Sequence, residues 1–234
     1  MSGKEATIYI VDQGASTGEC HNGRVESDLD YGMRYIWDKI AETMISNRTT
    51  AGVGVIGFRT GKTENELAES DPEAYSNISV MKPLGPMEMP HLKDLQHRIT
   101  SSDTDNGDAV SAIVVGIQLI EKFTTLKTGK PGKYARKIVL LSDGHGPLED
   151  DDIDPIAARI NELDIELVVV YVLPIERLKL QLRTKLAQGV LTLMTRNLDL
   201  SRTTNQTSRF VQIFSPIVSG SYYDRQEMKS FSNS

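Results

Sequence analysis

Residues 6–16 read ATIYIVDQGAS, and this stretch decides the fold. Its first part, Ala6–Asp12, is apolar and rich in β-branched and aromatic residues, with no polar residue on alternate positions. That pattern is typical of a strand covered on both faces in a parallel sheet. The strand ends at the carboxylate of Asp12, and a small polar loop follows it. We therefore expect a central strand whose carboxyl end carries polar groups.

The rest of the first three-quarters of the chain alternates similar strands with amphipathic segments. Further buried strands are predicted at Ala51–Phe58, Lys137–Ser142 and Ile165–Val172. Spacings of three and four between apolar residues predict helices over Ser27–Ser46, His91–Ile99, Asp108–Phe123 and Asp152–Leu163. A short strand at Asn77–Met81, ended by prolines, is predicted to be the antiparallel edge.

This alternation predicts an α/β class protein with three layers and a Rossmann-like, mainly parallel sheet that has one antiparallel edge strand and helices on both faces. The predicted domain covers residues 1–173. Residues 174–234 follow a different pattern and are expected to be a C-terminal extension of uncertain fold, partly helical and with a disordered end.

Composition excludes several classes of protein. The chain of 234 residues has one cysteine, Cys20, so it cannot form an intrachain disulfide. There is no run of about 18 apolar residues and no secretory signal, so neither a membrane segment nor export is expected. The four histidines are not at zinc-ligand spacing. An intracellular, reducing compartment is the simplest prediction.

Charge is distributed unevenly along the chain. The whole sequence carries −6, whereas residues 175–234 hold nine Lys or Arg and four Asp or Glu, a net +5. Residues 1–174 therefore carry −11, which argues against a surface that follows nucleic-acid phosphates. The acidic body is predicted to dock proteins, and direct DNA binding through the basic end is a competing hypothesis.

Asp12 and Ser16 suggest an oxygen site for Mg²⁺ at the end of the first strand. The pattern resembles the metal-dependent adhesion site of von Willebrand A (vWA) domains, Asp-x-Ser-x-Ser, which a second aspartate completes after a later strand; Asp143 stands there. Gly14 falls where that motif needs a hydroxyl, and Thr104 is a poor match for its separate threonine. The alternative is that Asp12 and Ser16 cap the loop and the helix after it.

Motifs for catalysis are weak. No GxxxxGK[ST] phosphate loop occurs: in Gly57–Thr63, GFRTGKT, the first glycine is one residue too close to the Gly-Lys pair, and an acidic loop follows. No GxSxG nucleophile elbow occurs, and Cys20 and His21 are adjacent, which rarely lets them act together. The chain is predicted not to be an enzyme.

The order and spacing of six segments resemble the N-terminal vWA domain of the Ku80 subunit of Ku, in its fungal form. The segments are Lys4–Ser16, Gly23–Ile40, Gly57–Gly61, Tyr75–Val80, Asp108–Ala112 and Arg136–Gly144. The resemblance covers roughly residues 4–173. It implies the vWA fold and a metal site that is degenerate at Asp12, Ser16 and Asp143, with no cofactor. A metal-dependent (Mg²⁺) adhesion-type vWA domain is the alternative.

The resemblance also implies a function. Ku binds DNA double-strand ends in the nucleus, starts non-homologous end joining and acts at telomeres. Ku80 pairs with Ku70, and DNA passes through later domains that we expect this chain to lack. The vWA domain docks short peptide motifs of repair factors, and by alignment Leu67, Tyr75 and Asp108 fall at one such groove. The alternative for Leu67 and Tyr75 is a purely structural role as loop anchors. Fungal members are sometimes labelled ATP-dependent helicase subunits.

Overall fold

The computed structural model describes residues 3–21, 23–46, 50–147 and 153–172. The predicted C-terminal extension, residues 174–234, lies outside the described residues. Among the helices of the described ranges, none combines the length and apolar character needed to cross a membrane.

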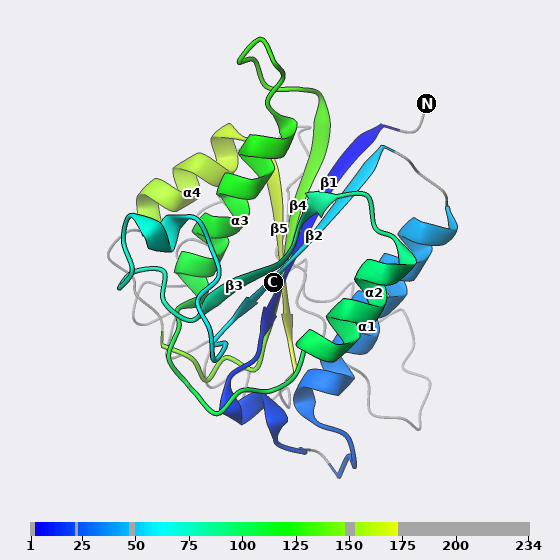
Figure 1. The fold of residues 1–234 in the computed structure, drawn as a ribbon, viewed down its shortest axis with the longest axis vertical. Coiled ribbons are helices and arrows are strands. Elements are labelled where there is room, and N and C mark those ends of the chain that lie inside the picture. The colour runs from blue at the N-terminus through cyan, green and yellow to red at the C-terminus, as the bar shows by residue number, and fades with distance from the viewer. Residues whose placement is uncertain (1–2, 22, 47–49, 148–152, 173–234) are drawn as a thin grey trace, which may run out of the picture.

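Within the described residues, five strands form one sheet (Figure 1). They are β1 (Lys4–Asp12), β2 (Ala51–Phe58), β3 (Ile78–Gly85), β4 (Tyr134–Ser142) and β5 (Ile165–Tyr171). The order is β3-β2-β1-β4-β5, with β1 at the centre and parallel to both of its neighbours. Strand β5 is parallel to β4, and β3 is antiparallel to β2 at the edge. The prediction of a mainly parallel sheet with one antiparallel edge strand is confirmed.

Two helices cover each face of the sheet (Figure 1). Helices α1 (Asp28–Ile45) and α2 (Met89–Arg98) lie on one face, and α3 (Ala109–Thr124) and α4 (Ile153–Glu162) on the other. Ser27 is the N-cap of α1, and its Oγ accepts a hydrogen bond of 3.0 Å from the backbone N–H of Asp30. Such a cap is worth about 1 kcal/mol.

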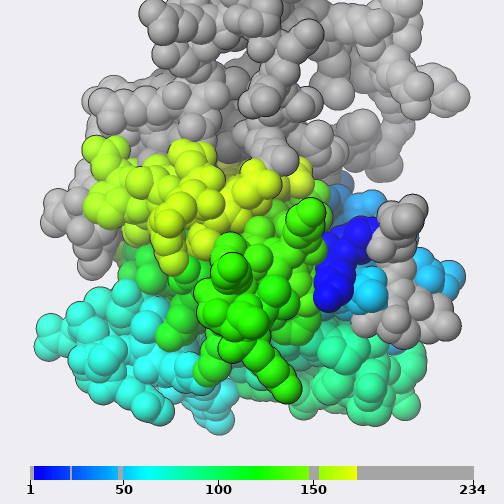
Figure 2. All heavy atoms as spheres, turned by 90° about the horizontal axis from the view of Figure 1, so that it is seen from above, coloured from blue at the N-terminus to red at the C-terminus, as the bar shows by residue number. Residues whose placement is uncertain are grey.

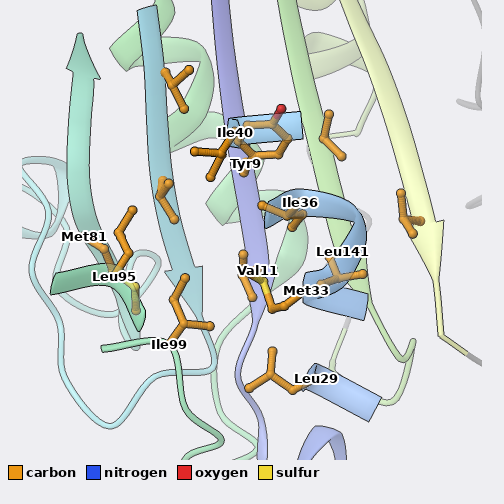
Figure 3. Packing of buried hydrophobic residues seen from close by; sticks show 14 of the residues in the cluster. Tyr9, Val11, Leu29, Met33, Ile36, Ile40, Met81, Leu95, Ile99 and Leu141 are labelled. Atoms are coloured by element: carbon orange, nitrogen blue, oxygen red, sulfur yellow. The ribbon is translucent and has the colours of Figure 1, made fainter. Parts of the chain in front are cut away.

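The core has two halves because successive residues of β1 point to opposite faces. Tyr9 and Val11 point towards α1 and α2, whereas Ile8 and Ile10 point towards α3 and α4. Figure 3 shows the first half, where the buried stripe of α1 meets the sheet. That stripe consists of Leu29, Met33, Ile36 and Ile40, and Trp37 and Met44 are partly buried beside it.

Strand β3 is longer than predicted. It was expected to end at Met81, before the prolines, but it runs through Pro83 to Gly85. An edge strand tolerates proline because its outer side needs no ladder hydrogen bond. The register shifts twice between β2 and β3, and the buried Lys82 ammonium donates to the carbonyl oxygens of Val53, at 2.7 Å, and Gly85, at 3.2 Å. Burial lowers the pKa of Lys82 to about 8.

Candidate functional site

The carboxyl ends of β1, β2 and β4 bring a buried arginine between two buried aspartates. Arg59 follows β2, is 0% exposed, and its Nη1 donates to both carboxylate oxygens of Asp12 at 3.1 Å. The same nitrogen donates to Oδ1 of Asp143 at 3.4 Å. Its Nη2 donates to Oγ of Ser16, at 3.0 Å, and to the largely exposed Asp105. Asp12 and Asp143, the two carboxylates predicted at this edge of the sheet, therefore both contact Arg59.

Asp12 is held from several sides. Its carboxylate accepts hydrogen bonds from the hydroxyl of Ser142, at 2.7 Å, and from the backbone N–H of Gly14, at 3.0 Å. Burial and the nearby Asp143 carboxylate nevertheless raise the pKa of Asp12 to about 6, against the opposing effect of Arg59. Of the two carboxylates that contact Arg59, Asp12 is therefore the one that is protonated more easily.

The pKa of Asp143 shifts in the opposite direction, although Asp143 is buried as well. Burial alone would raise its pKa, but the hydroxyl of Ser16 at 2.5 Å and the backbone N–H of His145 at 2.9 Å donate to it. With these donors and Arg59, the pKa of Asp143 lies below its ordinary value. Asp143 is therefore the member of the pair that stays deprotonated to lower pH.

The residues at this edge do not fit a magnesium ion. The Arg59 guanidinium lies between the two carboxylates that would ligate the cation. A Cβ atom at position 14 would lie 2.0 Å from Cζ of Arg59, so the hydroxyl residue of the adhesion motif has no room there. Within the described ranges, no group of three or more His, Cys, Asp or Glu side chains could hold a metal ion.

We expect the thermal midpoint of the chain to be the same, within about 1 °C, in millimolar MgCl2 and in EDTA. A cation bound by the native state alone would raise the midpoint. Differential scanning fluorimetry over a MgCl2 series measures this directly. A saturable rise in the midpoint would show that a metal ion can displace the Arg59 guanidinium from the two carboxylates.

Arg59 is the residue that sequence reasoning missed. Its φ of 55° is in the left-handed region, which costs a non-glycine residue roughly 1 kcal/mol. The hydroxyl of Ser102 donates to the Arg59 carbonyl at 2.6 Å, and the close approach of Gly107 to the Arg59 backbone helps to hold this conformation. The sequence offered only a weak signal: Arg59 directly follows a buried strand, as Asp12 ends the neighbouring one.

The three residues predicted to bind a peptide lie beside α3. Leu67 and Tyr75 are partly buried and pack against the core half that contains α3. Asp108 is buried and caps α3, accepting a hydrogen bond of 2.7 Å from the backbone N–H of Ser111. These positions agree with a role in shaping the loop and the helix start.

A groove of about 930 Å³ lies between β3, the loop after β2 and the second half of α3, and none of these three residues is among those that line it. Its apolar floor includes Val80, Leu84, Leu119 and Phe123. Glutamates line it on the loop side, at Glu64, Glu66 and Glu69. Leu67 itself does not line the groove but lies between Glu66 and Ala68, which do. Sequence analysis missed the residues of α3 because they matched the pattern of a buried helix.

The three layers, the single antiparallel edge strand and the polar carboxyl edge define an α/β domain of the vWA type. In agreement, a solved structure, the vWA domain of SpRpn10, matches with a TM-score of 0.50 at 12% identity, over 71% of this chain and 74% of that one. Within this class, the chain belongs to the Ku70/Ku80 N-terminal alpha/beta domain family, which matches residues 6–177.

Curated fungal relatives support the family assignment. A protein of Neurospora crassa is 46% identical over 170 residues, and one of Schizosaccharomyces pombe is 34% identical over 169 residues. Both are named ATP-dependent DNA helicase II subunit 2. The matches cover 73% and 72% of this chain but 23% of each relative, so the chain spans less than a quarter of their length.

Proposed function

We propose that the chain is the peptide-docking N-terminal domain of a Ku80-type subunit. In this role it serves a nuclear heterodimer with a Ku70-type partner, which binds DNA ends in non-homologous end joining and telomere maintenance. The name "subunit 2" of the fungal relatives supports the Ku80 type over the Ku70 type. DNA ends would be held by other parts of the subunit, and this domain would recruit repair factors.

The groove between β3, the loop after β2 and α3 is the observation that carries this proposal. An apolar floor beside glutamates suits a short peptide with both apolar and basic side chains, since apolar anchors supply affinity and charge supplies orientation. Glu64 is paired with Arg98 at 2.8 Å, and Glu66 with Lys122 at 2.7 Å. Such exposed pairs are worth at most about 1 kcal/mol, so a peptide cation could replace either partner.

Leu67 and Tyr75 would act by shaping this groove, whereas Asp108 would act at the start of α3, where it is the N-cap. Leu67 and Tyr75 pack on the core beneath the loop that carries the three glutamates. Hydrogen bonds hold that loop in place locally: the side-chain amide of Asn65 donates to the carbonyl oxygens of Tyr75, at 3.0 Å, and Ile78, at 2.9 Å. Loss of either apolar anchor would therefore move the glutamate side of the groove.

Leu67→Ala and Tyr75→Ala are each expected to weaken binding of a basic, apolar Ku-binding peptide about tenfold, or roughly 1.4 kcal/mol, because each truncation displaces the glutamate side of the groove. Isothermal titration calorimetry of the full chain measures the change. Glu69→Lys, an exposed position that does not disturb the core, is expected to weaken binding through charge alone.

Leu126→Ala is the matched control, because Leu126 is an apolar side chain that is 47% exposed on a different surface. It should leave the peptide affinity unchanged. Circular dichroism and thermal melts establish that each variant is folded. Wild-type affinity in folded Leu67→Ala, Tyr75→Ala and Glu69→Lys proteins would refute the proposed groove.

A non-catalytic role fits the segment that most resembles a phosphate loop. In Gly57–Thr63, Arg59 is committed to the buried aspartates. Thr60 is buried, and its hydroxyl is 2.6 Å from the carbonyl oxygen of Lys62. No helix starts at this segment, which continues into the loop that carries Leu67. The word "helicase" in the names of the relatives therefore finds no support in this part of the chain.

A further inference from the structure

A basic hairpin joins α3 to β4 and stands at the amino-terminal end of the parallel strands. The backbone N–H of Leu126 donates to the Lys130 carbonyl at 2.9 Å, and that of Gly129 donates to the Leu126 carbonyl at 2.8 Å. Gly129 has a φ of 75°, as a tight turn requires. Thr125 and Pro131 form an isolated antiparallel bridge below the turn. The hairpin therefore has a defined shape of its own.

The base of this hairpin is clamped to the domain. Phe123 and Tyr134 pack edge to face, with ring centroids 5.7 Å apart. Arg136 donates from Nε to the hydroxyl of Thr124 at 3.2 Å and from Nη2 to the carbonyl of Gly132 at 2.8 Å. A segment fixed at both ends loses little conformational freedom when it binds a partner.

The exposed side of the hairpin carries positive charge and no negative charge. Lys127, Lys130 and Lys133 are all exposed, and the segment 124–137 contains no Asp or Glu. Within the described residues, no ion pair is formed by any of these three lysines. In Figure 2 the hairpin (bright green) lies at the front of the molecule, with neither α4 (yellow-green) nor the loop after β2 (cyan) covering it.

We propose that Lys127, Lys130 and Lys133 bind the phosphate backbone of duplex DNA. Ammonium groups on a narrow turn can reach phosphates without any pocket, and backbone contacts of this kind need no base recognition. An acidic peptide would need apolar anchors to bind specifically, and Leu126 is the one large apolar side chain exposed among the residues of this hairpin. The observations therefore favour DNA over a protein partner.

This site is distinct from the peptide groove and goes beyond the function proposed above, which leaves DNA to other parts of the subunit. It also qualifies the argument from overall charge. The −11 of residues 1–174 is an average, whereas a phosphate responds to charges within about 10 Å at physiological salt. Glu121, Glu162 and Asp164 line the same hollow as Lys133, but so do Lys4, Arg136 and Arg159, so the local charge is not acidic. A cluster of lysines there can bind DNA.

The test uses the full chain and a fluorescein-labelled duplex of about 30 base pairs, with anisotropy titrations in roughly 50–200 mM KCl. Lys127→Ala/Lys130→Ala is expected to weaken binding about tenfold at the lowest salt. It should also reduce the slope of log K against log salt by about 2, because each phosphate contact contributes roughly 0.9. Lys127→Arg/Lys130→Arg, which keeps both charges, should bind like the wild type.

Lys62→Ala/Lys93→Ala is the charge-matched control, since both lysines are exposed on other segments. It should change the affinity less than twofold. Equal loss in the control, or an unchanged salt slope in the hairpin variant, would refute the site. Competition by a polyglutamate peptide as strong as that by unlabelled duplex would also refute the assignment to DNA. Peptide binding in the groove is measured separately, so failure of either proposal is recognised independently.

Discussion

Arg59→Ala should lower the free energy of unfolding by about 3–5 kcal/mol at pH 7.5, the range for removal of one partner from a buried ion pair. The variant leaves Asp12 and Asp143, each 1% exposed, facing one another without a cation. Much of the cost is therefore the desolvation of two uncompensated carboxylates rather than the loss of an attraction.

The loss of stability caused by Arg59→Ala should be smaller at lower pH. In the wild type, burial and Asp143 already raise the pKa of Asp12 to about 6, above its ordinary value of 3.8. The native state therefore binds more protons than the unfolded state between about pH 4 and 6, and the stability due to Asp12 falls as pH rises through that interval. Without Arg59 the pKa of Asp12 rises further, so Arg59→Ala should be least damaging near pH 5.

Urea unfolding at pH 5 and pH 7.5, followed by circular dichroism, tests both statements. Arg34→Ala is the control, because Arg34 is 66% exposed and pairs with Glu26 at 2.5 Å on the surface. It should cost at most about 1 kcal/mol. A loss below 1 kcal/mol for Arg59→Ala, or one that grows towards pH 5, would contradict the role given to this arginine.

Most of the fold was predictable because the central strands are continuous apolar runs. Strand β2 has the predicted bounds, Ala51–Phe58, because all eight of its residues are buried and the run of apolar residues therefore coincides with the strand. The end of β3 was not predictable in the same way. Proline normally argues against a strand, and the edge position of β3, which makes Pro83 tolerable, is a property of the assembled sheet.

The candidate site was predictable to a similar extent. Asp12, Ser16 and Asp143 were found because carboxyl ends of parallel strands meet at one edge. Arg59 was not, because an arginine after a strand is ordinary and its partners lie 47 and 84 residues away in the sequence. The glycine at position 14 was seen as a defect of a metal motif. In the structure, the absence of a side chain at Gly14 leaves the space that the Arg59 guanidinium occupies.

Gly14→Ser should cost about 3 kcal/mol, because it forces Arg59 away from the aspartates. The backbone of Gly14, with φ −58° and ψ 159°, is one that serine adopts without strain, so the cost comes from contact alone. The added Cβ would lie 2.0 Å from Cζ and 2.2 Å from Nε of Arg59. Gly61→Ser is the matched control, since nothing lies within 4 Å of a Cβ there, and should change stability by less than about 0.5 kcal/mol.

A double-mutant cycle separates this explanation from a general intolerance of serine in the loop. If the Arg59 guanidinium is what excludes a side chain at position 14, the serine should add little to the cost of Arg59→Ala. The coupling energy between the two positions would then be about 2–3 kcal/mol, the upper part of the range for residues in contact. Additive losses would mean that Gly14 is needed for a reason other than Arg59, and the account of glycine and arginine jointly replacing a metal site would fail.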